Sequence, residues 1–293
     1  MRPLYYEHSG VVGFAGPLLM TAAALVTAVP GGAVFGIISQ INPFIYLDGI
    51  MTVFYGFGCG WVMGLLGQMA KVRSEALTWF FGIALGLLCT FTGWVFWIYA
   101  ASDFQQMWLT EPMIVWSIIA EINARGSWNL FGWEPTGYAL GFFWVVEGVV
   151  ITLGALGGVF TKLGQSDNIY CEACRRWTKA AFTSPPLLPV PDGDALKSAL
   201  EAGDFAALQP LHPPPGGDPI DPAAPGASFT RLLVMACARC DQLHVLDVIA
   251  VSVDDDGDES ENLIVDNLLI ESSLTRQLQE RFSGYGEPES TKG

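Results

Sequence analysis

The sequence predicts an α-helical polytopic membrane bundle of about four transmembrane helices, followed by a small α+β soluble domain. Four apolar stretches are each long enough to cross a bilayer, which takes about 20 helical residues. Charge also divides the chain, because residues 1–163 hold five basic and eight acidic side chains, whereas residues 164–293 hold nine and twenty-one. Two Cys-x-x-Cys pairs occur in the second part alone. We therefore expect a transmembrane domain over 1–163, a soluble domain over 164–282 and a disordered tail over 283–293.

The four expected spans cover residues 11–38, 49–69, 77–99 and 137–160. The first contains Pro30, followed by two glycines, and a proline inside a helix removes a hydrogen bond and bends the helix. We expect one long kinked helix there. A cleaved signal peptide is the alternative, but the leader is weakly basic and no small-x-small cleavage site follows a short apolar core.

Basic residues in the connections predict the orientation of the bundle. Lys71 and Arg73 lie between the second and third spans, and Lys162 ends the fourth. The connection 101–136 carries Arg125 as its single base. Cytoplasmic loops are enriched in Lys and Arg. The sequence therefore predicts a multi-pass protein of the cell membrane, with both termini in the cytoplasm.

The outer connection contains a helical pattern from Pro112 to Ala124. We expect an interfacial helix on the outer leaflet, because tryptophan rings accumulate at the water–lipid boundary. The alternative is a helix outside the membrane that packs on the bundle. The expected apolar face and the flanking tryptophans are Met113, Trp116, Ile119 and Ala120, with Trp108, Trp128 and Trp133 around them.

Small residues recur four apart within three of the spans. Such steps let helix backbones approach closely in lipid, where the hydrophobic effect does not drive association. They predict either packing within the bundle or a homo-oligomer interface. The glycines concerned are Gly56, Gly60 and Gly64, then Gly82 and Gly86, then Gly154 and Gly158.

Glu147 falls about ten residues into the fourth span. A carboxylate near mid-bilayer costs at least a few kcal/mol, so intramembrane acids face the bundle interior or serve a function. The other spans offer no Lys or Arg at this depth, which leaves Tyr55, Gln68 or a backbone carbonyl as partners. The functional hypothesis is a proton or cation site. The structural one is a polar clamp in an otherwise apolar bundle.

The two cysteine pairs are Cys171 with Cys174, and Cys237 with Cys240. Four soft thiolates form the tetrahedral set that zinc favours, and they leave no coordination position open for catalysis. We expect a structural zinc ion, with mononuclear iron or a redox dithiol as alternatives. His212 and His244 are possible ligands, although both have the character of surface residues, and Cys59 and Cys89 that of small buried hydrophobes.

The cysteine pairs and their flanking strands resemble the zinc-ribbon class over about residues 168–255. Phe229–Ala236 and His244–Val253 read as two strands of a hairpin that carries the second pair. The resemblance implies a compact metal-stabilised domain. It leaves the proline-rich insert 183–226 unmatched, and 62 residues separate the pairs, more than in compact sites.

Further elements follow from local patterns in the soluble domain. Asp194 is positioned to cap a helix from Ala195 to about Leu208. The acidic run 254–259 fails the EF-hand template and predicts a solvated hairpin turn. Strand patterns at 263–265 and 268–270 precede a short helix at 273–282.

Functional motifs are otherwise missing from the sequence. It offers no nucleophile–base pair, phosphate-binding glycine loop or His/Glu metal-hydrolase motif, which disfavours an enzyme. The acidic soluble domain disfavours nucleic acid as a partner. We expect a membrane-anchored module that binds a cytoplasmic protein. The alternative is a small transporter or channel that uses Glu147 and is regulated by the soluble domain.

Overall fold

The computed structural model describes residues 3–42, 45–104, 111–126, 132–164, 169–214, 220–221 and 224–283. The chain divides into two compact units. One, the helical unit, is Ser9–Gly164; the other, the soluble unit, joins Met1–His8 to Gln165–Gly293. The predicted tail lies outside the described residues, except for Ser283.

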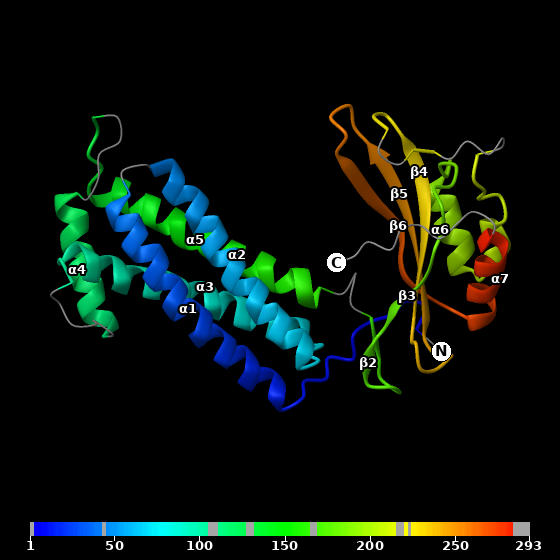
Figure 1. Ribbon diagram of the computed structural model, residues 1–293, viewed down its shortest axis with the longest axis horizontal. Helices are drawn as coiled ribbons and strands as arrows, with labels where there is room; N and C mark the ends of the chain where they lie inside the picture. The colour runs from blue at the N-terminus through cyan, green and yellow to red at the C-terminus, as the bar shows by residue number, and fades with distance from the viewer. Residues whose placement is uncertain are drawn as a thin grey trace. The chain divides into compact units, whose positions relative to one another are not determined.

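Four long apolar helices make up most of the helical unit (Figure 1). They are α1 (Ala15–Ile41), α2 (Ile45–Met69), α3 (Glu75–Ala101) and α5 (Gly137–Leu163). Each is long and apolar enough to cross a membrane, which confirms the predicted membrane bundle. Pro30 lies inside α1, which continues through it as one helix.

Within the helical unit, α2 packs chiefly on α5, and α1 on α3. A Cβ atom added to Gly56 or Gly60 would collide with the carbonyl oxygen of Ile151 or Ala155 on α5, and one added to Gly64 would lie 2.8 Å from the Val159 oxygen. Small residues are required wherever two helix backbones approach this closely. The glycines four apart on α2 therefore pack against α5 of the same chain.

Helix α4 (Pro112–Arg125) contacts the bundle through Val115. Val115 is buried and clusters with Val95 and Ile98 of α3, and Ile119 of the predicted apolar face packs against this cluster. Met113 and Trp116 of the same predicted face are 73% and 67% exposed, as an interfacial helix would leave them. The predicted Trp108 and Trp128 lie outside the described residues.

The soluble unit is built on an antiparallel sheet in the order β3-β4-β5-β6. Its strands are β3 (Lys179–Thr183), β4 (Ser228–Ala236), β5 (His244–Val253) and β6 (Glu259–Ile270), preceded by a small hairpin of β1 (Tyr170–Cys171) and β2 (Arg176–Trp177). The predicted β4–β5 hairpin is confirmed, and the two short strand patterns after it form the single strand β6.

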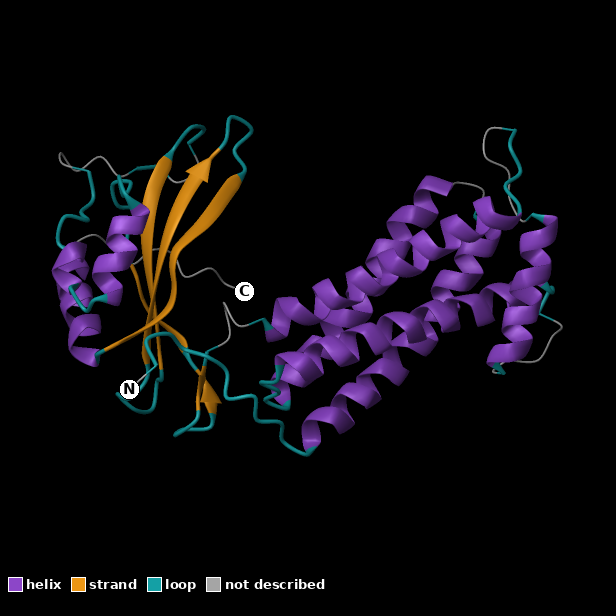
Figure 2. Ribbon diagram, turned by 180° about the vertical axis from the view of Figure 1, so that it is seen from behind, coloured by secondary structure: helices purple, strands orange, loops and turns teal. Residues whose placement is uncertain are grey.

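Helices cover one face of this sheet (Figure 2). They are α6 (Gly193–Glu201), the 3₁₀ helix η1 (Phe205–Leu208) and α7 (Ser272–Phe282). Their apolar sides meet the sheet in one core that includes Leu196, Leu200, Leu208, Leu232, Leu246, Val248, Leu278 and Phe282.

The helix in the insert differs from the prediction in its cap and its length. Asp192, not Asp194, accepts the capping hydrogen bond, from the Ala195 amide at 2.9 Å. The helix ends at Glu201, because the chain turns at Gly203 with φ +80°, a conformation that glycine adopts without steric cost. The predicted acidic turn is observed between β5 and β6, where Gly257 has φ +87°.

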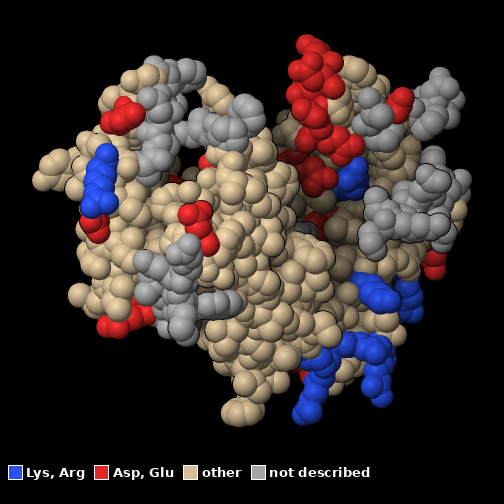
Figure 3. All heavy atoms as spheres, turned by 60° about the vertical axis from the view of Figure 1, so that its left-hand side comes forward, with Lys and Arg blue, Asp and Glu red and all other residues tan. Residues whose placement is uncertain are grey.

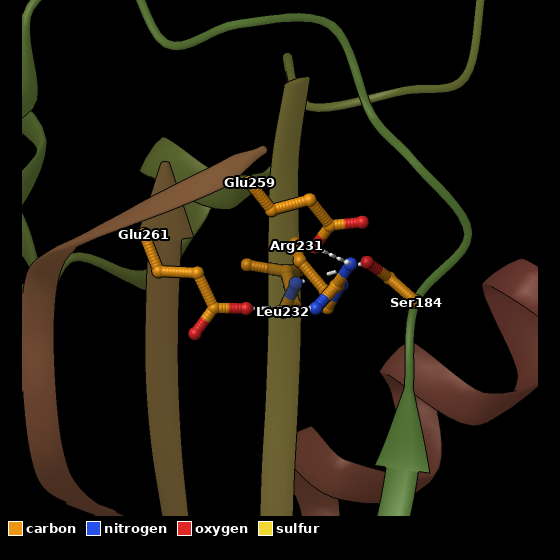
Figure 4. A network of polar contacts seen from close by, with 5 residues as sticks. All are labelled: Ser184, Arg231, Leu232, Glu259 and Glu261. Atoms are coloured by element: carbon orange, nitrogen blue, oxygen red, sulfur yellow. Dashed lines mark hydrogen bonds and ion pairs between the residues drawn. The ribbon is translucent and has the colours of Figure 1, made fainter. Parts of the chain in front are cut away.

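A polar network ties the end of β3 to β4 and β6 (Figure 4). The Ser184 hydroxyl accepts a hydrogen bond from the Leu232 amide at 2.9 Å, and the Ser184 amide donates to the Leu232 carbonyl at 2.9 Å. Arg231 lies 3.1 Å from a Glu261 oxygen and 3.9 Å from a Glu259 oxygen. Partly exposed ion pairs of this kind contribute little to stability.

The N-terminal segment belongs to the soluble unit, although the sequence analysis places it with the spans. The Leu269 amide donates to the Leu4 carbonyl at 3.0 Å, and the Tyr6 amide donates to the Asn267 carbonyl at 2.8 Å. An edge strand such as β6 has unpaired backbone groups, and residues 4–6 satisfy some of them. The soluble unit is therefore completed by residues from both ends of the chain.

Candidate metal centre

The four predicted cysteines lie on two turns of the soluble unit. Cys171 ends β1 and Cys174 lies in the turn before β2. Arg175, the next residue, has φ +54°, the left-handed conformation that a tight turn often assigns to glycine. Cys237 follows β4 and Cys240 lies in the turn before β5. Each pair thus occupies the connection of an antiparallel hairpin.

Strand pairing brings the two turns together across 62 residues of sequence. Strand β2 continues through Thr178 into β3, whose first residue, Lys179, pairs with Ala236 at the end of β4. A hydrogen bond also holds Thr178 in place, because its amide donates to the Ile169 carbonyl at 2.8 Å. The first cysteine turn therefore lies beside the second, and the long insert is accommodated on the helical side of the sheet.

All four sulfur atoms lie within 4.8 Å of one another. Cys171 Sγ and Cys240 Sγ are 3.7 Å apart. A tetrahedral zinc site with Zn–S bonds of about 2.3 Å places its sulfur atoms about 3.8 Å apart. A disulfide, by contrast, requires about 2.05 Å. The arrangement fits a four-coordinate metal ion and excludes a disulfide between these two atoms as they stand.

The acidity of the cysteines differs from one to the next. Burial opposes ionisation of Cys237. The Cys237 sulfur accepts hydrogen bonds from the backbone N–H groups of Arg239 and Cys240, and these lower its pKa to about 7. Burial raises the pKa of Cys171, and the hydrogen bond to Cys240 is the main cause that raises the pKa of Cys174 to about 12. The thiolate is the ligand form, so the hydrogen bonds that lower the pKa of Cys237 also favour metal binding by this residue.

Neither of the alternative histidines belongs to the cluster. His212 is exposed, as expected. The expectation that His244 is a surface residue is wrong, because it is only 7% exposed. Its Nδ1 atom is 2.9 Å from the Thr275 hydroxyl, and its Nε2 atom is 3.4 Å from an Asp241 carboxylate oxygen. His244 therefore links the second cysteine turn to α7.

Glu147 lines a cavity in the helical unit that contains further polar side chains, which corrects the expectation of an otherwise apolar bundle. The cavity has a volume of about 490 Å³ and is also lined by Asp48, Thr52 and Thr90. Tyr55 is not the partner of Glu147, because its hydroxyl bonds to the Ala28 and Cys89 carbonyls at 3.0 and 3.2 Å. Asp48 was not among the predicted site residues, since it stands at the start of a span and resembles a loop residue. Its spacing of four from Thr52, on one helix face, was the available signal.

Comparison with known proteins gives no relative. No protein-family model, curated protein or solved structure matches this chain. The site must therefore be interpreted from its own geometry.

Proposed function

We propose that the soluble unit holds one structural zinc ion and serves as a membrane-anchored docking module for a protein partner. The observation that carries the proposal is the convergence of four cysteine sulfurs within 4.8 Å on two hairpin turns. Four thiolates saturate a tetrahedral ion, so the site supplies stability rather than a reactive position.

Zinc is the metal that this set of donors favours in a reduced cytoplasm. Thiolate ligands in tetrahedral geometry select zinc or iron, and zinc needs no redox partner to remain bound. Disulfides are rare in that compartment, which agrees with the 3.7 Å separation of Cys171 and Cys240 sulfurs. The pairing of residues 4–6 with β6 supports the predicted orientation, because both ends of the helical unit connect to one soluble unit.

The rim of the cysteine cluster is basic in an otherwise acidic domain. Four exposed bases stand in or beside the two turns, against the exposed acids Glu172 and Asp241. Figure 3 shows a group of Lys and Arg side chains at the lower right and a group of acidic side chains at the top, with others of both kinds elsewhere. We therefore propose that the partner presents carboxylates to this rim. The four bases are Arg175, Arg176, Lys179 and Arg239.

Two measurements test the proposal. Elemental analysis of the purified full chain should find one zinc per chain, and the Cys237→Ser variant should lose it, while Cys59→Ala in the helical unit keeps it. A preparation without metal and with six free thiols would contradict the zinc site.

Partner capture should then separate the rim from the rest of the surface. Arg175→Glu with Arg176→Glu should lose the partners of the wild type, and Lys197→Glu with Arg276→Glu, exposed bases elsewhere in the soluble unit, should retain them. Identical partner sets for the wild type, the rim variant and Cys237→Ser would remove the docking function.

A second candidate function, transport or conduction through the helical unit, is favoured by the cavity that contains Glu147. It predicts ion or solute flux in proteoliposomes that Glu147→Gln abolishes. Flux that is absent in both forms, or unchanged by the substitution, would remove this candidate.

A further inference from the structure

The cavity around Glu147 has the size of a binding site for a small molecule. Its volume of about 490 Å³ lies within the range of about 300–1,000 Å³ usual for ligand pockets. All four long helices contribute to its wall, through Ser39 of α1, Thr52 of α2, Thr90 of α3 and Glu147 of α5, among others.

The wall includes hydrogen-bond acceptors around Glu147, beside the donor groups of Gln40, Asn42 and the tryptophans. Asp48 and Glu147 contribute carboxylates. The Thr52 hydroxyl donates its proton to the Asp48 carbonyl at 2.7 Å, and the Thr90 hydroxyl donates to the Gly86 carbonyl at 2.9 Å. The lone pairs of both hydroxyl oxygens therefore remain for a ligand that donates hydrogen bonds.

The two carboxyl groups of the cavity lack a basic counterpart among the described residues. None of the described residues that line it is Lys, Arg or His. Asp48 accepts a hydrogen bond from the Asn42 side chain at 3.0 Å, whereas Glu147 has neither a hydrogen bond nor an ion pair with any residue that the structure describes. Carboxylates at membrane depth require compensation, and a bound cation supplies it.

Indole rings complete the wall. Trp94, Trp97 and Trp144 all line the cavity. Trp94 and Trp144 meet edge to face with ring centroids 4.8 Å apart, and Trp94 and Trp97 do so at 5.6 Å. Tryptophan is the aromatic residue that attracts cations most strongly, and the same rings offer apolar surface.

We infer that this cavity binds a small organic cation, a protonated amine attached to an apolar body. The ammonium group donates to Glu147, Asp48 and the threonine oxygens, and the apolar body lies among the indole rings. A bare metal ion would leave the aromatic wall and most of the volume unused. The inference shares its cavity with the transport candidate but requires binding alone.

Equilibrium dialysis of the full chain in lipid nanodiscs tests this inference, with radiolabelled phenethylamine as the cationic probe and phenethyl alcohol as its neutral counterpart. Empty nanodiscs measure partition into lipid, which is subtracted. The amine should bind saturably, and the alcohol should bind at least about tenfold more weakly, because it lacks the charge. Equal binding of the two probes, or no saturable binding of the amine, would overturn the inference.

Three variants assign the binding to the cavity. Glu147→Gln should weaken amine binding at least about tenfold, since the unpaired carboxylate is removed. Asp48→Asn should weaken it less, because Asn42 already compensates that charge, and Glu134→Gln, an exposed acid outside the spans, should leave it unchanged. Amine affinity that is unaltered by Glu147→Gln would overturn the proposed site. If the Glu147→Gln variant does not fold, the comparison of the two probes and the affinity of Asp48→Asn test the site instead. Binding without flux would remove the transport candidate and leave this inference standing.

Discussion

The Tyr6 hydroxyl accepts a hydrogen bond from the backbone amide of Tyr170 at 2.9 Å, across 164 residues of sequence. Tyr170 immediately precedes Cys171 and is 2% exposed. The N-terminal segment therefore reaches both the edge of the sheet and the first cysteine turn.

Removal of the Tyr6 hydroxyl should loosen the first cysteine turn. The Tyr6→Phe variant leaves the buried Tyr170 amide without its acceptor, which costs about 1–3 kcal/mol. Hydrogen exchange followed by mass spectrometry should show faster exchange in peptides that cover 169–178. Tyr138→Phe, at a fully exposed position in the helical unit, serves as the control. Unchanged exchange in Tyr6→Phe would show that the hydrogen bond does not support the turn.

Tyr5 should lose its phenolic proton at a higher pH than an ordinary tyrosine. Burial, then its 2.5 Å hydrogen bond to Glu201 and the charges of Glu201 and Asp266, raise its pKa to about 12. A tyrosine whose pKa is raised by folding holds its proton longer in the folded state. Its contribution to stability is therefore present below pH 10 and is lost as the pH rises from about 10 to about 12. The phenolate absorbance of the wild type minus that of Tyr5→Phe, followed against pH, should give this late titration. A midpoint of the difference at pH 10 would contradict it.

Chelation of the metal should unfold the soluble unit before the helical unit. A ligand that binds only the folded state stabilises it according to its concentration and affinity, so its removal lowers the melting temperature. Circular dichroism should show loss of the β-sheet signal at lower temperature in chelator, with the helical signal retained. Restoration by added zinc is the control. Coincident melting with and without chelator would argue against a metal-stabilised fold.

Substitutions of two glycines on α2 should have opposite effects. A Cβ at Gly60 collides with the Ala155 backbone, whereas one at Gly58 has no neighbour within 4 Å. Gly60→Ala should therefore separate α2 from α5 and destabilise the bundle. Gly58→Ala should be neutral or stabilise by about 0.5–1 kcal/mol, because alanine favours helix. Unfolding in sodium dodecyl sulfate mixed micelles measures both, and equal behaviour would refute the close α2–α5 contact.

Limited trypsin treatment tests the proposed orientation. Arg125 is an exposed base at the end of α4, and Arg175 and Arg176 are exposed bases of the soluble unit. Trypsin added to intact spheroplasts should cut after Arg125 alone. Inverted vesicles should give cleavage at Arg175 and Arg176, with Arg125 protected. The reverse pattern would place the soluble unit outside.

Periodic and local signals explain which elements the sequence predicted well. The four spans are long apolar runs, and strand β5 was predicted over His244–Val253, the range observed. The two cysteine pairs could be assigned to one metal site because four thiolates suit a single zinc ion, although the pairs lie far apart in the sequence. Helix α4 was predicted, but the burial of Val115 was not, since Val115 and Trp116 are both apolar and only the position of α3 decides which of them is buried.

Long-range relationships account for what the sequence did not reveal. Leu4–Tyr6 is too short for a strand pattern, and nothing local indicates that β6 is its partner. The cavity likewise depends on Asp48 and Glu147, which approach one another only through the packing of α2 on α5. His244 has the alternation of a surface position in the strand pattern, but α7 covers it.

The sharing of the soluble unit between the two ends of the chain has a consequence for biosynthesis. Residues 4–6 precede the four long helices in the chain, whereas β6 follows them. The sheet edge is therefore completed only after the whole helical unit has been synthesised. Residues 4–6 and β6 can pair only when the two ends of the helical unit lie on the same side of any membrane that it spans. An arrangement that separated these ends would leave β6 and the first cysteine turn without the N-terminal segment.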